Sequence, residues 1–124
     1  MRSEYRFDYR RARPNRFAEA LAGRTPATGT RQVDTAEARV TEWRLPAGSA
    51  IGHHRHELDY VVVPITDGVL TVVSAGGSAQ SPITRGQSYF RKAGVEHDVR
   101  NETEAEIVFV EIEIKAPLSG RPGR

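Results

Sequence analysis

A succession of short strand-like segments, separated by turn sequences, fills most of this 124-residue chain. The segments are too short and too closely spaced for helices, and turn residues such as Pro46, Gly48 and Gly76 separate them. The Asp67-Gly68 pair predicts a hairpin that joins the two segments on either side of it. Expected strands are residues 38–45, 60–65, 69–74, 81–84, 88–91, 97–100 and 106–114. This pattern predicts an all-β sandwich or barrel.

Two of these segments show which side chains face the interior. In residues 38–45, Thr41, Trp43 and Leu45 share one face, and we expect Trp43 in the core between the sheets. Residues 106–114 alternate throughout, because successive side chains of a strand point to opposite faces. We expect the core face of this strand to carry Val108, Val110, Ile112 and Ile114, and the outer face to carry Ile107, Phe109, Glu111 and Glu113.

All four histidines lie in two short segments, His53-His54-Arg55-His56 and the region of His97. A spacing of two puts His54 and His56 on one face of a strand, with His53 on the other. The chain has no cysteine, so a metal would be bound through nitrogen and oxygen atoms. Imidazole suits transition metals, and we expect one divalent ion (Fe, Ni, Mn or Zn) held by His54, His56 and His97.

These segments resemble the paired motifs of the cupin superfamily. Gly48, His54 and His56 match the first motif, and the second motif is matched by Gly86, Gly94, His97 and Asn101, with Lys92 at the usual proline position. The resemblance covers about residues 33–115 and includes small single-domain bacterial members, one of them linked to beta-alanine degradation. It implies a double-stranded β-helix, that is, a jelly-roll barrel, with a metal pocket inside.

The first motif lacks its usual glutamate, because Tyr60 and Val61 occupy the two places where it would stand. Asp59, one residue earlier, is the candidate carboxylate ligand. The alternative is that Asp59 is a turn residue that caps the chain between strands. Glu57 lies on the wrong face of the strand to reach the metal.

Tyr60, Tyr89 and Arg91 lie close in sequence to the expected ligands and are candidates for substrate binding. Arg91 could hold a substrate carboxylate through paired hydrogen bonds. We therefore expect a metal-binding cupin that acts on a small polar or carboxylated metabolite. Reactions known in the superfamily include those of dioxygenases, isomerases and decarboxylases, and a non-catalytic binding module for a small molecule or a metal is the alternative.

The charge of the chain divides it into two parts. Residues 1–32 carry eight arginines and three acidic residues, whereas residues 33–115 carry eight basic and thirteen acidic groups. Tyr5, Phe7 and Tyr9 alternate with charged residues, which favours an edge strand over a nucleic-acid contact. A short helix is expected between Asn15 and Gly23. We expect an N-terminal arm (1–32) with this strand and helix, a linker over 25–30, the barrel (33–115) and a flexible tail (116–124).

The sequence contains no apolar run long enough to span a membrane and no secretion signal, so we expect a cytoplasmic protein. The outward Ile107 and Phe109 of the last strand, together with the alternating Tyr5, Phe7 and Tyr9, would leave apolar surface exposed. A homodimer would cover it.

Overall fold

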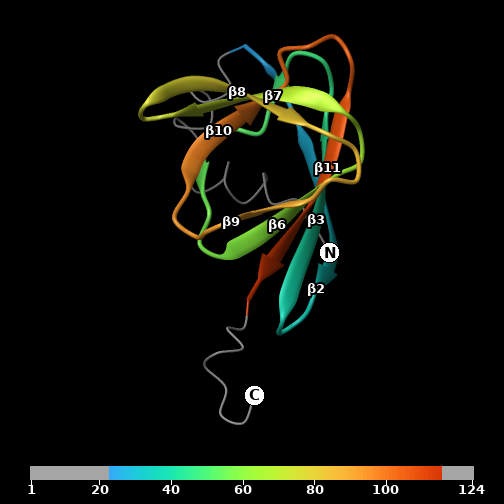
Figure 1. Cartoon of the computed structure of the whole chain (residues 1–124), viewed down its shortest axis with the longest axis vertical. Helices are drawn as coiled ribbons and strands as arrows, with labels where there is room; N and C mark the ends of the chain where they lie inside the picture. The colour runs from blue at the N-terminus through green and yellow to red at the C-terminus, as the bar shows by residue number, and fades with distance from the viewer. Residues whose placement is uncertain (1–22, 116–124) are drawn as a thin grey trace.

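Residues 23–115 are described by a computed structural model, and they form two β-sheets that face each other (Figure 1). The expected all-β barrel is confirmed, and no helix occurs among residues 23–115. The six-stranded sheet contains β1 (Thr25–Pro26), β4 (Ser49–Ala50), β10 (Glu96–Arg100), β7 (Gly68–Ser74) and β8 (Gly77–Ile83), with β5 (His54–Arg55) also paired to β10. The five-stranded sheet has the order β2 (Thr28–Asp34), β3 (Ala38–Leu45), β11 (Ile107–Ile114), β6 (Asp59–Pro64) and β9 (Tyr89–Arg91).

The five-stranded sheet is the more regular of the two. Strand β11 lies at its centre and pairs antiparallel with β3 from Ile107, opposite Leu45, to Ile114, opposite Ala38. On its other side β11 pairs with β6, where Glu111 lies opposite Val62. Long unbroken ladders of this kind fix which side chains share a face, because a slip by one residue would turn every side chain over.

The expected hairpin at Asp67-Gly68 is wrong, because β6 and β7 belong to different sheets. The turn instead carries the chain from one sheet to the other. The Asp67 carboxylate accepts a hydrogen bond of 2.8 Å from the Arg85 amide, and Gly68 packs so closely on Ile107 that a Cβ there would lie 2.8 Å from its side chain. By contrast, Gly76 and Gly77 do join two paired strands, β7 and β8, as expected.

The core lies between the inner faces of the sheets and includes Trp43, Leu45, Tyr60, Val62, Leu70, Val99, Ile107 and Phe109. The expected burial of Trp43 is confirmed. The assignment of faces in β11 is wrong: Ile107 and Phe109 are 1% and 2% exposed, whereas Ile114 is 39% exposed. Glu111 and Glu113 thus share the inner face with them.

The physical reason is that β11 is apolar on both faces at its start and carries its glutamates on the core side. Inside the barrel, Glu111 accepts a hydrogen bond from Trp43, and Glu113 lies 3.4 Å from the Arg39 guanidinium. Outside, Ile112 lies between Val40 and Val61 of the neighbouring strands, so apolar side chains form a row across the outer face. Alternation alone therefore indicated the wrong face.

Residues 25–30, expected as a linker, instead form β1 and the beginning of β2. Gly29 allows β2 to pack closely on β3, because a Cβ at this position would lie only 2.7 Å from the Trp43 ring. The expected N-terminal strand, the helix between Asn15 and Gly23, and the tail lie outside the described residues. Among residues 23–115, no helix is long and apolar enough to cross a membrane.

Candidate metal centre

Three histidines from the six-stranded side come together inside the barrel. His54 lies in β5 directly opposite His97 of β10, and His56 follows β5 by one residue. The Nε2 atoms of His54 and His56 are 3.1 Å apart, and those of His56 and His97 are 3.3 Å apart. His54 and His56 are buried, and His97 is half-buried. The structure therefore brings together the three histidines predicted as ligands.

Hydrogen bonds to the backbone hold this segment, since β5 is only two residues long. Gly52 has a φ of 103°, which other residues rarely adopt, and its amide donates a 2.9 Å hydrogen bond to the buried Asp98 carboxylate. Its carbonyl in turn accepts a 2.7 Å hydrogen bond from His54 Nδ1. Further along, the His56 amide donates to Val95 O and its carbonyl accepts from the Gly94 amide, each at 2.8 Å. The histidine segment is thus anchored on both sides.

The three imidazoles are neutral at physiological pH. Burial lowers the pKa of His54, and burial with the neighbouring histidines lowers the pKa of His56 to about 2. Burial lowers the pKa of His97 to about 3, with contributions from His54 and Arg91. Neutral imidazole is the form that binds a metal, because its unprotonated nitrogen carries the free electron pair.

The geometry of the donor set fits a metal ion. Because His54 Nδ1 donates its proton to Gly52 O, its Nε2 is left with a free electron pair. Two nitrogen atoms at a metal–ligand distance of about 2.1 Å and at right angles lie about 3 Å apart, close to the two Nε2 separations observed. Within residues 23–115, the ligand atoms of these three histidines all lie within 4.8 Å of one another. Three histidines could therefore hold one ion.

His53 points away from this group, as its position in the strand predicted. Its Nε2 lies 2.6 Å from the Glu96 carboxylate, and both side chains are exposed. This pair lies beside a groove on the outside of the barrel that also includes Asp98 and Arg100.

Asp59, the predicted carboxylate ligand, does not lie with the histidines that could hold an ion. It is the first residue of β6, and its carboxylate accepts a 2.8 Å hydrogen bond from the amide of Ala93. This is the capping role that the sequence left as the alternative. The hydrogen bond joins the start of β6 to the turn after β9.

The three predicted substrate-binding residues all line one cavity of about 80 Å³ that also contains His97. Tyr60 is buried and stacks on His56 with ring centres 4.0 Å apart. Arg91 lies opposite Tyr60 in the ladder, and its guanidinium carbon is 4.6 Å from the centre of the Tyr89 ring. Burial raises the pKa values of both tyrosines, so their hydroxyls stay protonated at neutral pH.

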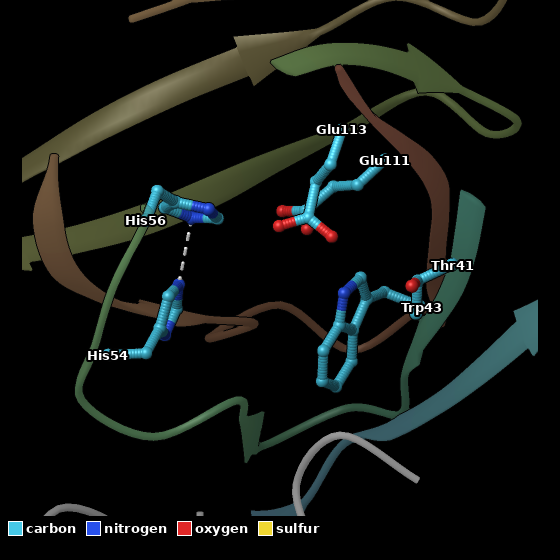
Figure 2. A pocket seen from close by; sticks show the side chains of 6 residues that line it. All are labelled: Thr41, Trp43, His54, His56, Glu111 and Glu113. Atoms are coloured by element: carbon cyan, nitrogen blue, oxygen red, sulfur yellow. Dashed lines mark hydrogen bonds between the residues drawn. The ribbon is translucent and has the colours of Figure 1, made fainter. Parts of the chain in front are cut away.

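Glu111 and Glu113 are the site residues that sequence reasoning missed. Figure 2 shows their carboxylates facing the same small cavity as His54 and His56, with Trp43 and Thr41 beside them. Burial raises the pKa of Glu111 to about 8, with a further contribution from Glu113, while the Trp43 indole N–H opposes the shift. Burial also raises the pKa of Glu113, against the effect of Arg39. The sequence signal that could have indicated them is the presence of two glutamates within the otherwise apolar strand β11.

Glu111 lines two cavities. One, of about 10 Å³, lies between the glutamates and the rings of His54 and His56. The other is the 80 Å³ cavity that contains His97 and Arg91. Only the smaller of the two is limited to about the size of one water molecule. Glu111 therefore borders both cavities, and each cavity is also lined by at least one of the three histidines.

Comparison with known proteins agrees with the fold. The sequence matches the Cupin domain family over residues 41–113, and the chain belongs to this family. It is 55% identical over 95 residues to the beta-alanine degradation protein BauB of Pseudomonas aeruginosa. The matched region covers 77% of this chain and 100% of that protein. The resemblance to small bacterial cupins is thereby confirmed.

Solved structures show the same architecture. A cupin domain from Bordetella pertussis superimposes with a TM-score of 0.74 and 54% identity, covering 75% of this chain and 97% of the other. An RmlC-like cupin with a double-stranded β-helix from Methanocaldococcus jannaschii gives a TM-score of 0.62 at 14% identity, over 72% of this chain and 80% of the other. The second likeness shows the fold alone.

Proposed function

We propose that this cupin is a metal-dependent enzyme that acts on a small carboxylated metabolite. The observation that carries the proposal is the convergence of three neutral imidazoles on one point beside a cavity. His54, His56 and His97 would hold one divalent ion, and the chemistry of these ligands suits iron, nickel, manganese and zinc. When bound, such an ion supplies Lewis-acid or redox chemistry to a substrate beside it.

The residues of the cavity bind and orient the substrate in this proposal. Arg91, at the exposed end, offers a guanidinium that pairs with a carboxylate. Apolar side chains of Val62, Leu70 and Phe109 line the interior and exclude water. Tyr60 supports the His56 ring by stacking on it. Asp59 takes no part in this arrangement.

The relative from Pseudomonas supports the substrate class. Its name places that protein in beta-alanine degradation, and it matches this chain over its own full length. We therefore extend the proposal to three-carbon carboxylates related to beta-alanine as the first compounds to test.

The test measures metal content and turnover together. Protein purified without chelator is analysed by plasma mass spectrometry, loaded with each of the four ions, and incubated with ¹³C-labelled three-carbon carboxylates while products are followed by NMR. Metal-dependent turnover that is lost in His54→Ala would support the proposal. Binding without turnover would instead indicate the non-catalytic module, and failure of every ion to bind would overturn the metal site.

We also propose that the chain pairs as a homodimer, in the cytoplasm. Ile107 and Phe109, which were expected to form the apolar surface, are buried in the core. The outer row of the five-stranded sheet now supports this proposal, since Ile112 lies opposite Val61 and Val61 lies opposite the half-exposed Phe90. Sedimentation of the wild-type chain beside Val61→Glu tests it, and a wild-type monomer at micromolar concentration would contradict it.

A further inference from the structure

The cavity beside His97 is lined by one strongly basic and one acidic side chain. They are Arg91 and Glu111. They come from different strands, β9 and β11, on either side of β6. The rest of the lining is apolar apart from hydroxyl groups such as those of Tyr60 and Tyr89. A ligand in this cavity therefore meets a guanidinium cation and a carboxyl group that a cationic ligand would ionise.

We propose that this cavity selects a small zwitterion, with its carboxylate bound by Arg91 and its ammonium group bound by Glu111. This inference rests on the proposed function, because it places the ligand beside the histidine group. It assigns to Glu111 a specificity role that neither cupin motif contains, since Glu111 lies outside both motif segments.

Arg91 has hydrogen-bond donors available for the carboxylate. One of its terminal nitrogen atoms donates a 3.3 Å hydrogen bond to Phe90 O, and the guanidinium lies over the Tyr89 ring. A guanidinium has five N–H donors in a fixed planar fork, so this contact leaves a pair of them for a carboxylate. The contact with the Tyr89 ring restricts the movement of the guanidinium.

Glu111 differs from its neighbour Glu113 in its hydrogen-bond partner: the Glu111 carboxylate accepts from the neutral Trp43 indole, whereas Glu113 lies beside a guanidinium. Glu113 is held by Arg39 at 3.4 Å and does not line the cavity with Arg91. Burial raises the pKa of Glu111 to about 8, and an ammonium group beside it would favour the charged form. A cationic group of the ligand would thus stabilise the ionised form of Glu111, the glutamate that lines this cavity.

The register of the ladder places the two groups at a suitable separation. Glu111 lies opposite Val62, and Val62 lies opposite Tyr89, so Glu111 and β9 are two strand spacings apart, about 10 Å. Arg91 is two residues further along β9, on the same face as Tyr89. Both side chains line the same cavity of about 80 Å³, a volume that suits a small amino acid and not a long one.

The test compares three probes on the full chain loaded with one metal. Beta-alanine carries both charges, propionate lacks the ammonium group, and 3-aminopropan-1-ol lacks the carboxylate. We expect calorimetry to show beta-alanine binding at least about 10-fold more tightly than either single-charge probe, because hydrogen bonds to charged groups are stronger than neutral ones. Equal affinity for propionate and beta-alanine in the wild type would overturn the inference without any variant.

Two substitutions assign the charges. Glu111→Gln should reduce the affinity for beta-alanine about 10-fold and leave the affinity for propionate unchanged. Arg91→Gln should reduce the affinities for beta-alanine and propionate to a similar degree. Glu42→Gln is the matched control, because Glu42 is paired with Arg44 on the outer face of the same sheet. A Glu111→Gln variant that keeps the full preference for beta-alanine would contradict the assignment.

Metal content, measured on every sample, separates the two possible failures. If the chain binds metal and propionate but shows no preference for the zwitterion, this inference fails and the proposed function stands. If the chain binds no metal under any condition, the proposed function fails. Thermal unfolding of each variant shows whether a loss of affinity comes from a loss of fold.

Discussion

The two inner walls of the barrel place their functional side chains in different ways. On the six-stranded side, the histidines lie in or beside strands as short as β5, and hydrogen bonds at Gly52, Asp98 and Val95 hold them. On the five-stranded side, Glu111 and Arg91 are placed by the register of long antiparallel ladders. The six-stranded side, here called the histidine wall, thus depends on individual local contacts. The five-stranded side, here called the ladder wall, depends on many equivalent backbone pairs.

This difference separates the effects of mutation. A change in the histidine wall should alter metal binding more than stability, since few backbone pairs depend on it. A change that disturbs the ladder should alter stability and ligand choice while the histidines keep their positions.

Removing one histidine should have the largest effect. We expect His56→Ala to weaken metal binding by more than about 100-fold, because loss of a ligand exceeds the 10–100-fold effect of losing a group that only supports a ligand. His53→Ala is the control, since His53 lies nearby in sequence but pairs with Glu96 outside the site. Calorimetric titration with zinc measures both, and equal affinities in the two variants would show that the three histidines are not the site.

Crowding the ladder should reduce stability and leave the metal site unchanged. A Cβ at Gly29 would lie 2.7 Å from the Trp43 ring, so we expect Gly29→Ala to lower the free energy of unfolding by about 1–3 kcal/mol. Gly76→Ala is the control, because no atom lies within 4 Å of a Cβ there. Urea unfolding and metal titration together check this, and an equal loss of metal affinity would show that the walls are not independent.

The two walls should respond to pH with opposite signs in the metal-free protein. The pKa values of His56 and His97 are lowered to about 2 and about 3, so the unfolded chain binds protons below pH 6.5 that the folded chain does not. Each histidine therefore lowers the free energy of unfolding as pH falls from 6.5, by up to about 1.4 kcal/mol per pH unit. The pKa of Glu111 is raised to about 8, so its contribution is lost as pH rises from 4.5 to 8.

Variants separate these two contributions. Urea unfolding of wild type and His56→Gln across pH 4–6.5 should show a shallower dependence in the variant. Between pH 6.5 and 8, Glu111→Gln should remove a decline that the wild type shows. Parallel curves for wild type and both variants would mean that the folded-state pKa values of these groups are close to their ordinary ones.

The smallest effect is expected at Asp59. Asp59→Asn keeps an oxygen that can accept from the Ala93 amide, so we expect a stability change of about 1 kcal/mol or less and an unchanged metal affinity. Metal titration beside His56→Ala checks this. A loss of affinity comparable to that of His56→Ala would restore Asp59 as a ligand.

The histidine wall was the more predictable of the two from sequence. Imidazoles at His54 and His56, with a glycine pattern around His97, form a local motif that indicates chemistry directly. The ladder wall was less predictable, because β11 has apolar residues on both faces, and period-two alternation cannot say which face is buried. Only the positions of Trp43 and Arg39 on β3 show why Glu111 and Glu113 are accommodated inside.

The hairpin predicted at Asp67-Gly68 was wrong because the contacts of that turn are long-range in sequence. The Asp67 carboxylate accepts a hydrogen bond from the Arg85 amide, and the Asp59 carboxylate likewise accepts one from the distant Ala93 amide. Such contacts depend on how the two sheets are brought together, which local patterns do not contain.

Anomalous diffraction from crystals of the metal-loaded chain would show whether three histidine Nε2 atoms hold one metal ion. We expect one strong peak about 2.1 Å from Nε2 of His54, His56 and His97. A peak at the exposed His53–Glu96 pair instead, or no peak inside the barrel, would contradict it.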